Sequence, residues 1–128
     1  MLQLREQIRQ EGLSLGFARV GFASSERLPR GDVLSRWLRR GMAADMAYMA
    51  HGPRDDPRSL MPEARTAVVV VASYAAEEDP APGPGQGLLA RYARGQDYHL
   101  VLRQRLEALR SHISELVGRD VPARAAVD

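Results

Sequence analysis

The side chains best suited to chemistry are scattered along the sequence and form no known catalytic or metal-binding pattern. The sequence contains no HExxH pair, no Walker-type phosphate loop and no GxGxxG after a strand. His51, His99 and His112 lack the spacing of metal ligands, and His112 is expected at the surface near the end of a helix. The run GPGQG lacks the Lys and Ser/Thr of a phosphate cradle, so it is interpreted as a loop.

Two features of the composition restrict the chemistry further. The sequence has no cysteine, which excludes disulfides, thiolate metal sites and any iron–sulfur cluster held by this chain alone. All 18 basic residues are arginine. This bias has two interpretations, a GC-rich genome or a surface that faces phosphate groups, since arginine binds phosphate in bidentate fashion. Composition alone does not distinguish these two interpretations of the arginine bias.

The overall composition is that of one water-soluble domain. A chain of 128 residues that is 45% hydrophobic and 27% charged can build a core of its own. No stretch approaches the roughly 18 apolar residues of a membrane span. The start, MLQLREQIRQEG, is polar and amphipathic and differs from a signal peptide. We therefore expect a cytoplasmic monomer with no membrane contact.

Apolar residues at helical spacing predict three main helices that position these residues. The first covers residues 4–15 and ends at Gly16. The second begins at an N-cap at Asp32 and ends near Gly41, and a short helix is expected over 43–50. The longest begins at an Asp97 N-cap and ends at Gly118; its apolar positions are Leu102, Leu106, Leu109, Ile113 and Leu116.

Strands are predicted at 17–23, 67–74 and 121–128, a strand or an extended segment at 88–93, and a loop over 77–87. Consecutive valines in the second strand suggest burial on both of its faces. The predicted fold class is therefore α+β or α/β, a small mixed sheet flanked by helices, without an internal repeat or a linker between domains. Because the sequence stops on a strand, we expect it to be part of a longer protein.

Four segments carry a more specific signal than any of these elements. In chain order they are WLRRGM with MAYM (37–42, 46–49), RDDPRSLMP (54–62) before the valine strand and Tyr74, RYARGQDYH (91–99) with Leu102-Arg103, and AVD (126–128). Together they resemble the N-terminal domain of epoxyqueuosine reductase over essentially all 128 residues. One small departure is Ala44, where that family usually carries glycine.

The resemblance implies a function and its cofactors. That family reduces the epoxide of epoxyqueuosine at the wobble position of certain tRNAs to give queuosine. It uses cobalamin in this N-terminal region, whose domain resembles that of reductive dehalogenases, and 4Fe–4S clusters in a C-terminal ferredoxin-like region. Carried over by position, Arg54, Ala90 and Asp128 would contact cobalamin, and Asp128 would also donate a proton. No protein-bound metal ligand is implied here.

The residue types suit these roles, and each also has a structural alternative. Opening an epoxide leaves an alkoxide, so a carboxylic acid such as Asp128, kept protonated by burial, could supply the proton; the alternative is a helix-capping Asp. Arg54 would pair with an amide or the phosphate of cobalamin, or be an exposed loop residue. Ala90 would act through its backbone or its small size. Tyr98 and His99 are expected to be structural or near the cofactor, and three further residues are assigned to the core: Trp37, Met46 and Met49.

Residues 1–128 are thus predicted to be an incomplete N-terminal cobalamin-binding domain that lacks the C-terminal iron–sulfur domain and is inactive alone. Two other classes remain open. One is a non-catalytic corrinoid-binding module. The other is an Arg-rich RNA-binding domain without a cofactor, for which tRNA binding would depend strongly on salt.

Overall fold

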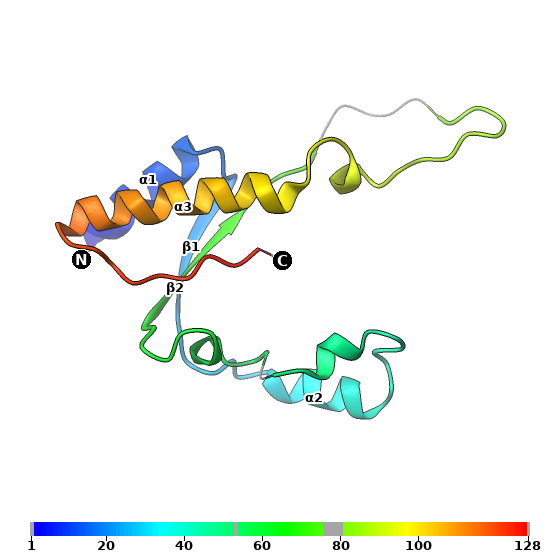
Figure 1. The fold of residues 1–128 in the computed structure, drawn as a ribbon, viewed down its shortest axis with the longest axis horizontal. Coiled ribbons are helices and arrows are strands. Elements are labelled where there is room, and N and C mark those ends of the chain that lie inside the picture. The colour runs from blue at the N-terminus through cyan, green and yellow to red at the C-terminus, as the bar shows by residue number, and fades with distance from the viewer. Residues whose placement is uncertain (1, 53, 76–80, 128) are drawn as a thin grey trace. The chain divides into compact units, whose positions relative to one another are not determined.

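The computed structural model describes residues 2–52, 54–75 and 81–127. Its elements are α1 (Leu2–Ser14), β1 (Arg19–Ser24), α2 (Gly31–Arg39), β2 (Thr66–Val71) and α3 (Tyr98–Val117), with 3₁₀ turns η1 (Ala47–Ala50), η2 (Pro57–Ser59) and η3 (Arg91–Ala93) (Figure 1). Helices with a small sheet confirm the α+β class. The chain divides into two compact units: unit 1 is residues 1–21 with 70–128, and unit 2 is residues 22–69.

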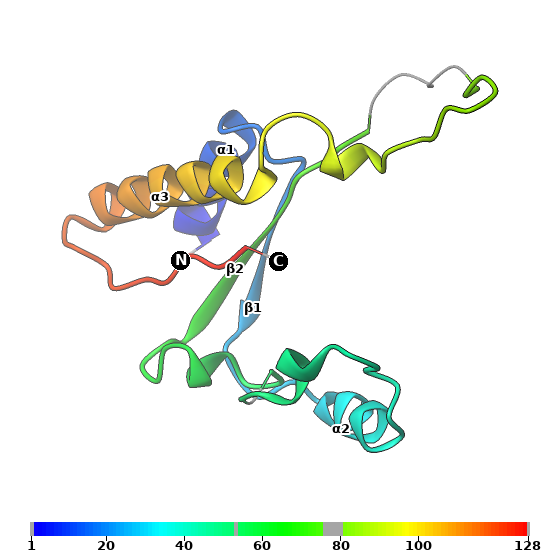
Figure 2. The ribbon, with the colours of Figure 1, turned by 45° about the vertical axis from the view of Figure 1, so that its right-hand side comes forward.

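The sheet consists of β1 and β2, which run side by side (Figure 2). Hydrogen bonds at the two ends of the strand pair, from Ala18 N to Val71 O (2.7 Å) and from Ser25 N to Arg65 O (3.3 Å), show that the pairing is antiparallel. The prediction that the valines are buried on both faces is wrong. Val69 and Val71 are 53% and 49% exposed, because no second layer among the described residues covers that face.

Unit 1 has its core where α1, α3 and β1 meet. The buried apolar side chains there are Ile8, Phe17, Val20 and Leu109. Helix α1 packs against α3, and Gly12 of α1 is buried. A methyl group on Gly12 would lie 2.5 Å from Cγ2 of Val20, so the helix can approach the strand this closely only with glycine at that position.

The predicted ends of the longest helix are confirmed. The Asp97 side chain accepts a hydrogen bond from the backbone N–H of His99 (2.9 Å), as an N-cap does. Gly118 follows the helix with a φ of +72°, the left-handed conformation that glycine adopts without strain. Gly16 has a φ of +87° just after α1. The sequence therefore predicts the cap residues of these helices correctly.

Unit 2 differs from the prediction in two details. The N-cap of α2 is Arg30 and not Asp32, which instead lies in the first turn and pairs with Arg36 at 3.0 Å. Within residues 43–50, only the four residues of η1 are helical, and the preceding residues form turns. Ala44 has a φ of +46°, so this alanine occupies a backbone conformation that favours glycine.

The strand predicted at 121–128 is wrong, because its described part, residues 121–127, is irregular. Residues 88–93, predicted as a strand or an extended segment, form no strand and are irregular up to η3. Neither segment has a partner strand within the described residues, and an isolated segment has no ladder to complete its backbone hydrogen bonds. The N–H of Val121 bonds instead to the Ser114 hydroxyl of α3 (3.1 Å). In the predicted loop, residues 77–80 fall outside the described residues, and 81–87 form turns or irregular chain.

Among the helices that the structure describes, none is long and apolar enough to cross a bilayer.

Candidate functional site

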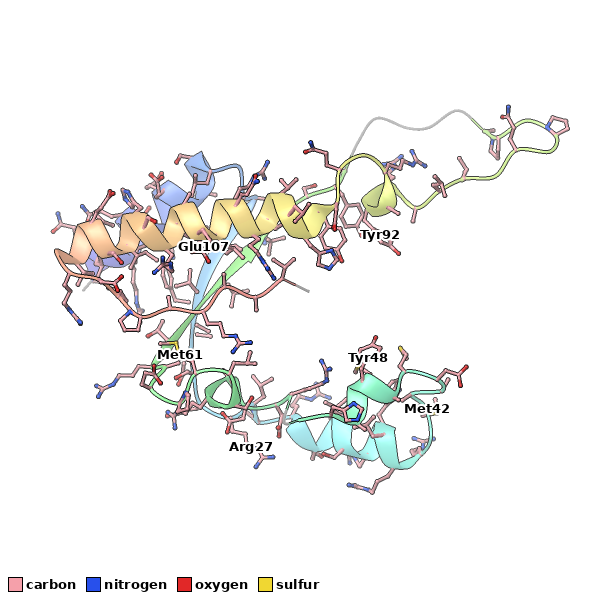
Figure 3. All side chains as sticks on the ribbon, in the orientation of Figure 1. Arg27, Met42, Tyr48, Met61, Tyr92 and Glu107 are labelled. Carbon is pink, nitrogen blue, oxygen red and sulfur yellow. The ribbon has the colours of Figure 1, made fainter. Side chains whose placement is uncertain are left out.

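Arg54 lies in unit 2, between η1 and η2, with an exposed side chain. Its Nη2 donates a hydrogen bond to the backbone oxygen of Tyr48 (2.8 Å), and its guanidinium carbon lies 5.5 Å from the centre of the Tyr48 ring. The ring and the carbonyl together hold the cation in place. Figure 3 shows the Tyr48 side chain on the segment that follows α2. Because Arg54 stays exposed, its charge is available to a ligand.

Asp55 fixes the loop that carries Arg54. Its carboxylate, 13% exposed, accepts a hydrogen bond from Nε of Arg27 (2.7 Å). Its backbone oxygen accepts another from Leu28 N (2.7 Å). The hydrogen bond from Arg27 lowers the pKa of Asp55. The carboxylate packs against Gly31 so closely that any side chain on Gly31 would collide with it. The loop is therefore anchored at the start of α2.

Ala90 lies in unit 1, just before η3, and is exposed. Its backbone oxygen accepts a hydrogen bond from Ala93 N (2.9 Å). The Arg94 guanidinium closes the same loop by donating from Nε (3.0 Å) and Nη2 (2.6 Å) to the backbone oxygen of Leu89. Leu88 and Leu89 are 61% and 71% exposed. A loop closed by hydrogen bonds thus presents a single methyl group beside exposed apolar side chains.

An aromatic cluster lies next to this loop in unit 1. The ring of Tyr92, labelled in Figure 3, makes edge contacts with Tyr74 and with Tyr98, each at 6.3 Å between ring centres. Tyr98 stacks on the His99 ring at 4.1 Å. His99 Nδ1 lies 2.8 Å from the Asp97 carboxylate, and this hydrogen bond lowers the pKa of Asp97. The cluster joins the end of β2, η3 and the start of α3.

The described residues contain no single site to which all three predicted site residues belong. Arg54 belongs to unit 2 and Ala90 to unit 1, each with the surroundings given above. Asp128 lies outside the described residues. Among the described residues, no group of three His, Asp or Glu side chains is arranged to hold a metal ion.

Sequence reasoning does not identify the aromatic surface around Ala90. Tyr74 and Tyr92 are 67% and 54% exposed and extend that surface. Tyr92 and Tyr98 are brought together by the turn between η3 and α3, and no helical or strand periodicity signals such a contact.

The core positions predicted in and after α2 are wrong. Trp37 and Met49 line an open apolar groove in unit 2. Met46 is 39% exposed. The helical spacing of these side chains indicates a shared apolar face, and that face is only partly covered within the described residues.

Known proteins match the chain over most of its length. The family model described as "Epoxyqueuosine reductase QueG, DUF1730" matches residues 54–128, a range that includes all three predicted site residues. The epoxyqueuosine reductase of Synechococcus sp. (strain CC9605) is 39% identical over 98% of this chain and 40% of its own length. That of Salmonella typhimurium is 36% identical over 91% of this chain and 32% of its own length.

Solved structures agree on the fold. A selenomethionine-labelled epoxyqueuosine reductase matches 90% of this chain and 32% of its own, with a TM-score of 0.74 and 24% identity. The enzyme from Streptococcus thermophilus matches 87% of this chain and 31% of its own, with a TM-score of 0.66 and 22% identity. The chain spans two fifths or less of the length of these relatives. The match over residues 54–128 shows that the chain belongs to the epoxyqueuosine reductase family.

Proposed function

We propose that this chain is the N-terminal, cobalamin-binding part of an epoxyqueuosine reductase, an oxidoreductase that converts epoxyqueuosine in the wobble position of tRNA to queuosine. The observation that carries this proposal is the family match over residues 54–128 together with relatives of that name aligned over nearly the whole chain. We propose that it works in the cytoplasm, as expected for an enzyme of tRNA modification.

Each unit, taken by itself, has a surface that suits one part of cobalamin. A corrin is a broad, flat, largely apolar ring with amide groups at its edge and a phosphate on its tail. In unit 1, the Ala90 methyl group and the exposed Leu88, Leu89 and Tyr92 offer an apolar face without a bulky obstacle at Ala90. In unit 2, the exposed Arg54 offers N–H donors for an amide or a phosphate. When bound, cobalamin supplies a reducing cobalt centre.

The protein's own part in this reaction is to position groups and to supply a proton. Removing the epoxide oxygen as water requires electrons and protons. We propose that the carboxyl group of Asp128 delivers a proton to the oxygen. The electrons come from elsewhere, because a chain without cysteine offers no thiolate for a 4Fe–4S cluster. In the family such clusters belong to the C-terminal part, so this chain alone is expected to be inactive.

Titrating the 128-residue chain with cobalamin tests the cofactor assignment. We expect the corrin absorbance spectrum to change on binding. Arg54→Ala should weaken binding about tenfold, as expected for loss of a charge-assisted hydrogen bond. Arg58→Ala removes an exposed arginine from the same segment and should bind normally. If the unaltered chain causes no change in the corrin spectrum, the proposal is contradicted. If that chain also binds tRNA in a salt-sensitive way, the RNA-binding alternative is favoured.

The role of Asp128 requires the full-length reductase. Asp128→Asn should retain cobalamin and lose most turnover of epoxyqueuosine tRNA, since an amide cannot donate the proton in the same way. Asp120→Asn is a matched control, because Asp120 has an 86% exposed side chain. If Asp128→Asn is as active as the unaltered enzyme, Asp128 is not the proton donor. An unaltered full-length protein that binds cobalamin and shows no turnover would instead indicate a corrinoid-binding module.

A further inference from the structure

An open apolar groove runs along α2 in unit 2. Its volume is about 490 Å³, and it is lined by Arg30, Val33, Leu34, Trp37 and Met49. The first four come from one face of α2 and its N-cap, and Met49 comes from η1. The volume falls in the range of roughly 300–1,000 Å³ typical of small-ligand sites. The groove could therefore hold one flat group against the tryptophan.

The indole of Trp37 is the largest ring in the groove. Trp37 is only half-buried, so part of its surface remains open. A half-open indole can stack with another planar ring, and a nucleobase is planar on both faces. Tyr48 and Met42, also exposed, project from the segment after α2 (Figure 3). The apolar surface thus continues past the groove into this segment.

Positive charge accompanies this surface. Arg30 lines the groove, and Arg40, three residues after Trp37, follows on the same side at the other end of α2; both side chains are exposed. Within the described residues neither has an acidic partner, whereas Arg36, on the opposite side of α2, pairs with Asp32. Trp37 lies between these two cations along the helix, which matches a base that has a phosphate on either side. An apolar protein segment in this groove would leave the arginines without partners.

We propose that the α2 groove binds an unpaired nucleotide of the tRNA substrate, with its base on Trp37 and the neighbouring phosphates at Arg30 and Arg40. This inference rests on the proposed function only in taking tRNA as the substrate. It assigns a contact surface in unit 2 that is distinct from Arg54. Double-stranded RNA cannot bind in this way, because its bases are stacked on one another and closed to the indole.

The chain contains a single tryptophan, so its fluorescence reports on this groove alone. We expect an anticodon stem-loop RNA to quench the Trp37 emission. A fully paired RNA of the same length and charge should not quench it at equal occupancy, measured in parallel by anisotropy of a labelled RNA. A cobalamin titration of the same preparation tests the proposed function separately, so either result can fail without the other.

Variants of Trp37 test the stacking contact with the base, and variants of the arginines test the contacts with the phosphates. Trp37→Leu should weaken stem-loop binding roughly 5- to 150-fold, the loss expected for one base–aromatic stack. Trp37→Phe keeps a ring and should restore most of the affinity; circular dichroism checks that both variants fold. Arg40→Gln should lower the slope of log affinity against log salt by about 0.7, the share of one phosphate that is no longer neutralised. Arg39→Gln, on the opposite side of α2, should leave that slope nearly unchanged. Arg58→Gln is the control for removing an arginine of unit 2 outside the groove.

Three results would overturn the inference. The first is equal binding of looped and paired RNA without quenching. The second is unchanged stem-loop affinity in Trp37→Leu. The third is quenching by the remaining part of a full-length reductase, supplied as a separate polypeptide, with RNA excluded, because the groove would then be an internal protein interface.

Discussion

Adding one methyl group at Gly12 tests the packing of unit 1. In most exposed helix positions, Gly→Ala stabilises a protein by about 1 kcal/mol, because alanine has the higher helix propensity. At Gly12 the new Cβ would lie 2.5 Å from Cγ2 of Val20, whereas ordinary contact begins at 3.4 Å. The helix and strand would have to separate by nearly an ångström. Valine is stiff and buried at this position, so it has no alternative site for its methyl group.

The two effects can be weighed against each other. Overpacking of this kind costs about 1–3 kcal/mol. Set against a propensity gain of about 1 kcal/mol, Gly12→Ala should lower the free energy of unfolding by up to about 2 kcal/mol. If Val20 is first changed to alanine, the obstructing methyl groups are gone. In that background Gly12→Ala should raise the free energy of unfolding by about 1 kcal/mol, the full propensity gain.

Urea unfolding gives the free energy of unfolding of the unaltered chain, of each single variant and of the double variant. Far-ultraviolet circular dichroism follows the transition, because α1 and α3 give most of the helical signal of the chain. Gly87→Ala is the control, since Gly87 has open space around its Cβ position and should tolerate the change. The decisive result is the sign of the change that Gly12→Ala causes in the free energy of unfolding, measured with Val20 present and in the Val20→Ala variant. Stabilisation by Gly12→Ala with Val20 present would refute the close approach of helix and strand.

Three further changes probe other parts of the chain. Leu109→Ala removes a side chain that is only 2% exposed and should lower the free energy of unfolding by about 2–5 kcal/mol in the same urea experiment. Ala44→Gly should raise it by about 0.5–1 kcal/mol, since relief of the left-handed conformation outweighs the greater freedom of glycine in the unfolded chain; Trp37 fluorescence follows this transition. The pKa of Asp55 is held below its ordinary value of 3.8 by Arg27, so this pair stabilises the fold above that pH, and the stabilisation is lost as the pH falls through the lowered pKa. Arg27→Gln should therefore be less stable than the unaltered chain at neutral pH and should converge with it in acid; a constant difference at all pH values would show that the charge of Asp55 is not involved.

The long helices α1 and α3 and the caps of α3 were predictable because they depend on neighbours in the sequence, whereas the N-cap of α2 was placed two residues too late. Asp97 and Gly118 mark the ends of α3, since an Asp side chain can accept from the N–H two residues later and glycine can take a positive φ. Strands depend on a partner elsewhere in the chain. Residues 88–93 and 121–127 have apolar residues suited to strands, yet no strand lies beside them within the described residues.

The roles of Arg54 and Ala90 stay predictions that come from the resemblance of motifs. Their surroundings were not predictable from the sequence, because the ring of Tyr48 beside Arg54 and the hydrogen bonds of Asp55 depend on how the loops fold. The apolar stripe with Trp37 indicated an amphipathic helix, and such a stripe does not reveal whether a core or a ligand covers it. Sequence reasoning therefore places Trp37 in the core, where the structure has a groove.

The hydrogen bonds from Arg94 to the backbone oxygen of Leu89 make position 90 suitable for the attachment of a label. The loop is closed by main-chain and arginine contacts, so its shape does not rely on the alanine side chain. Ala90→Cys would create the only thiol in the chain, ready for a fluorescent or spin label. A bulky label attached there would cover the face of unit 1 proposed for the corrin, so the labelled protein should bind cobalamin more weakly than the unlabelled Ala90→Cys protein.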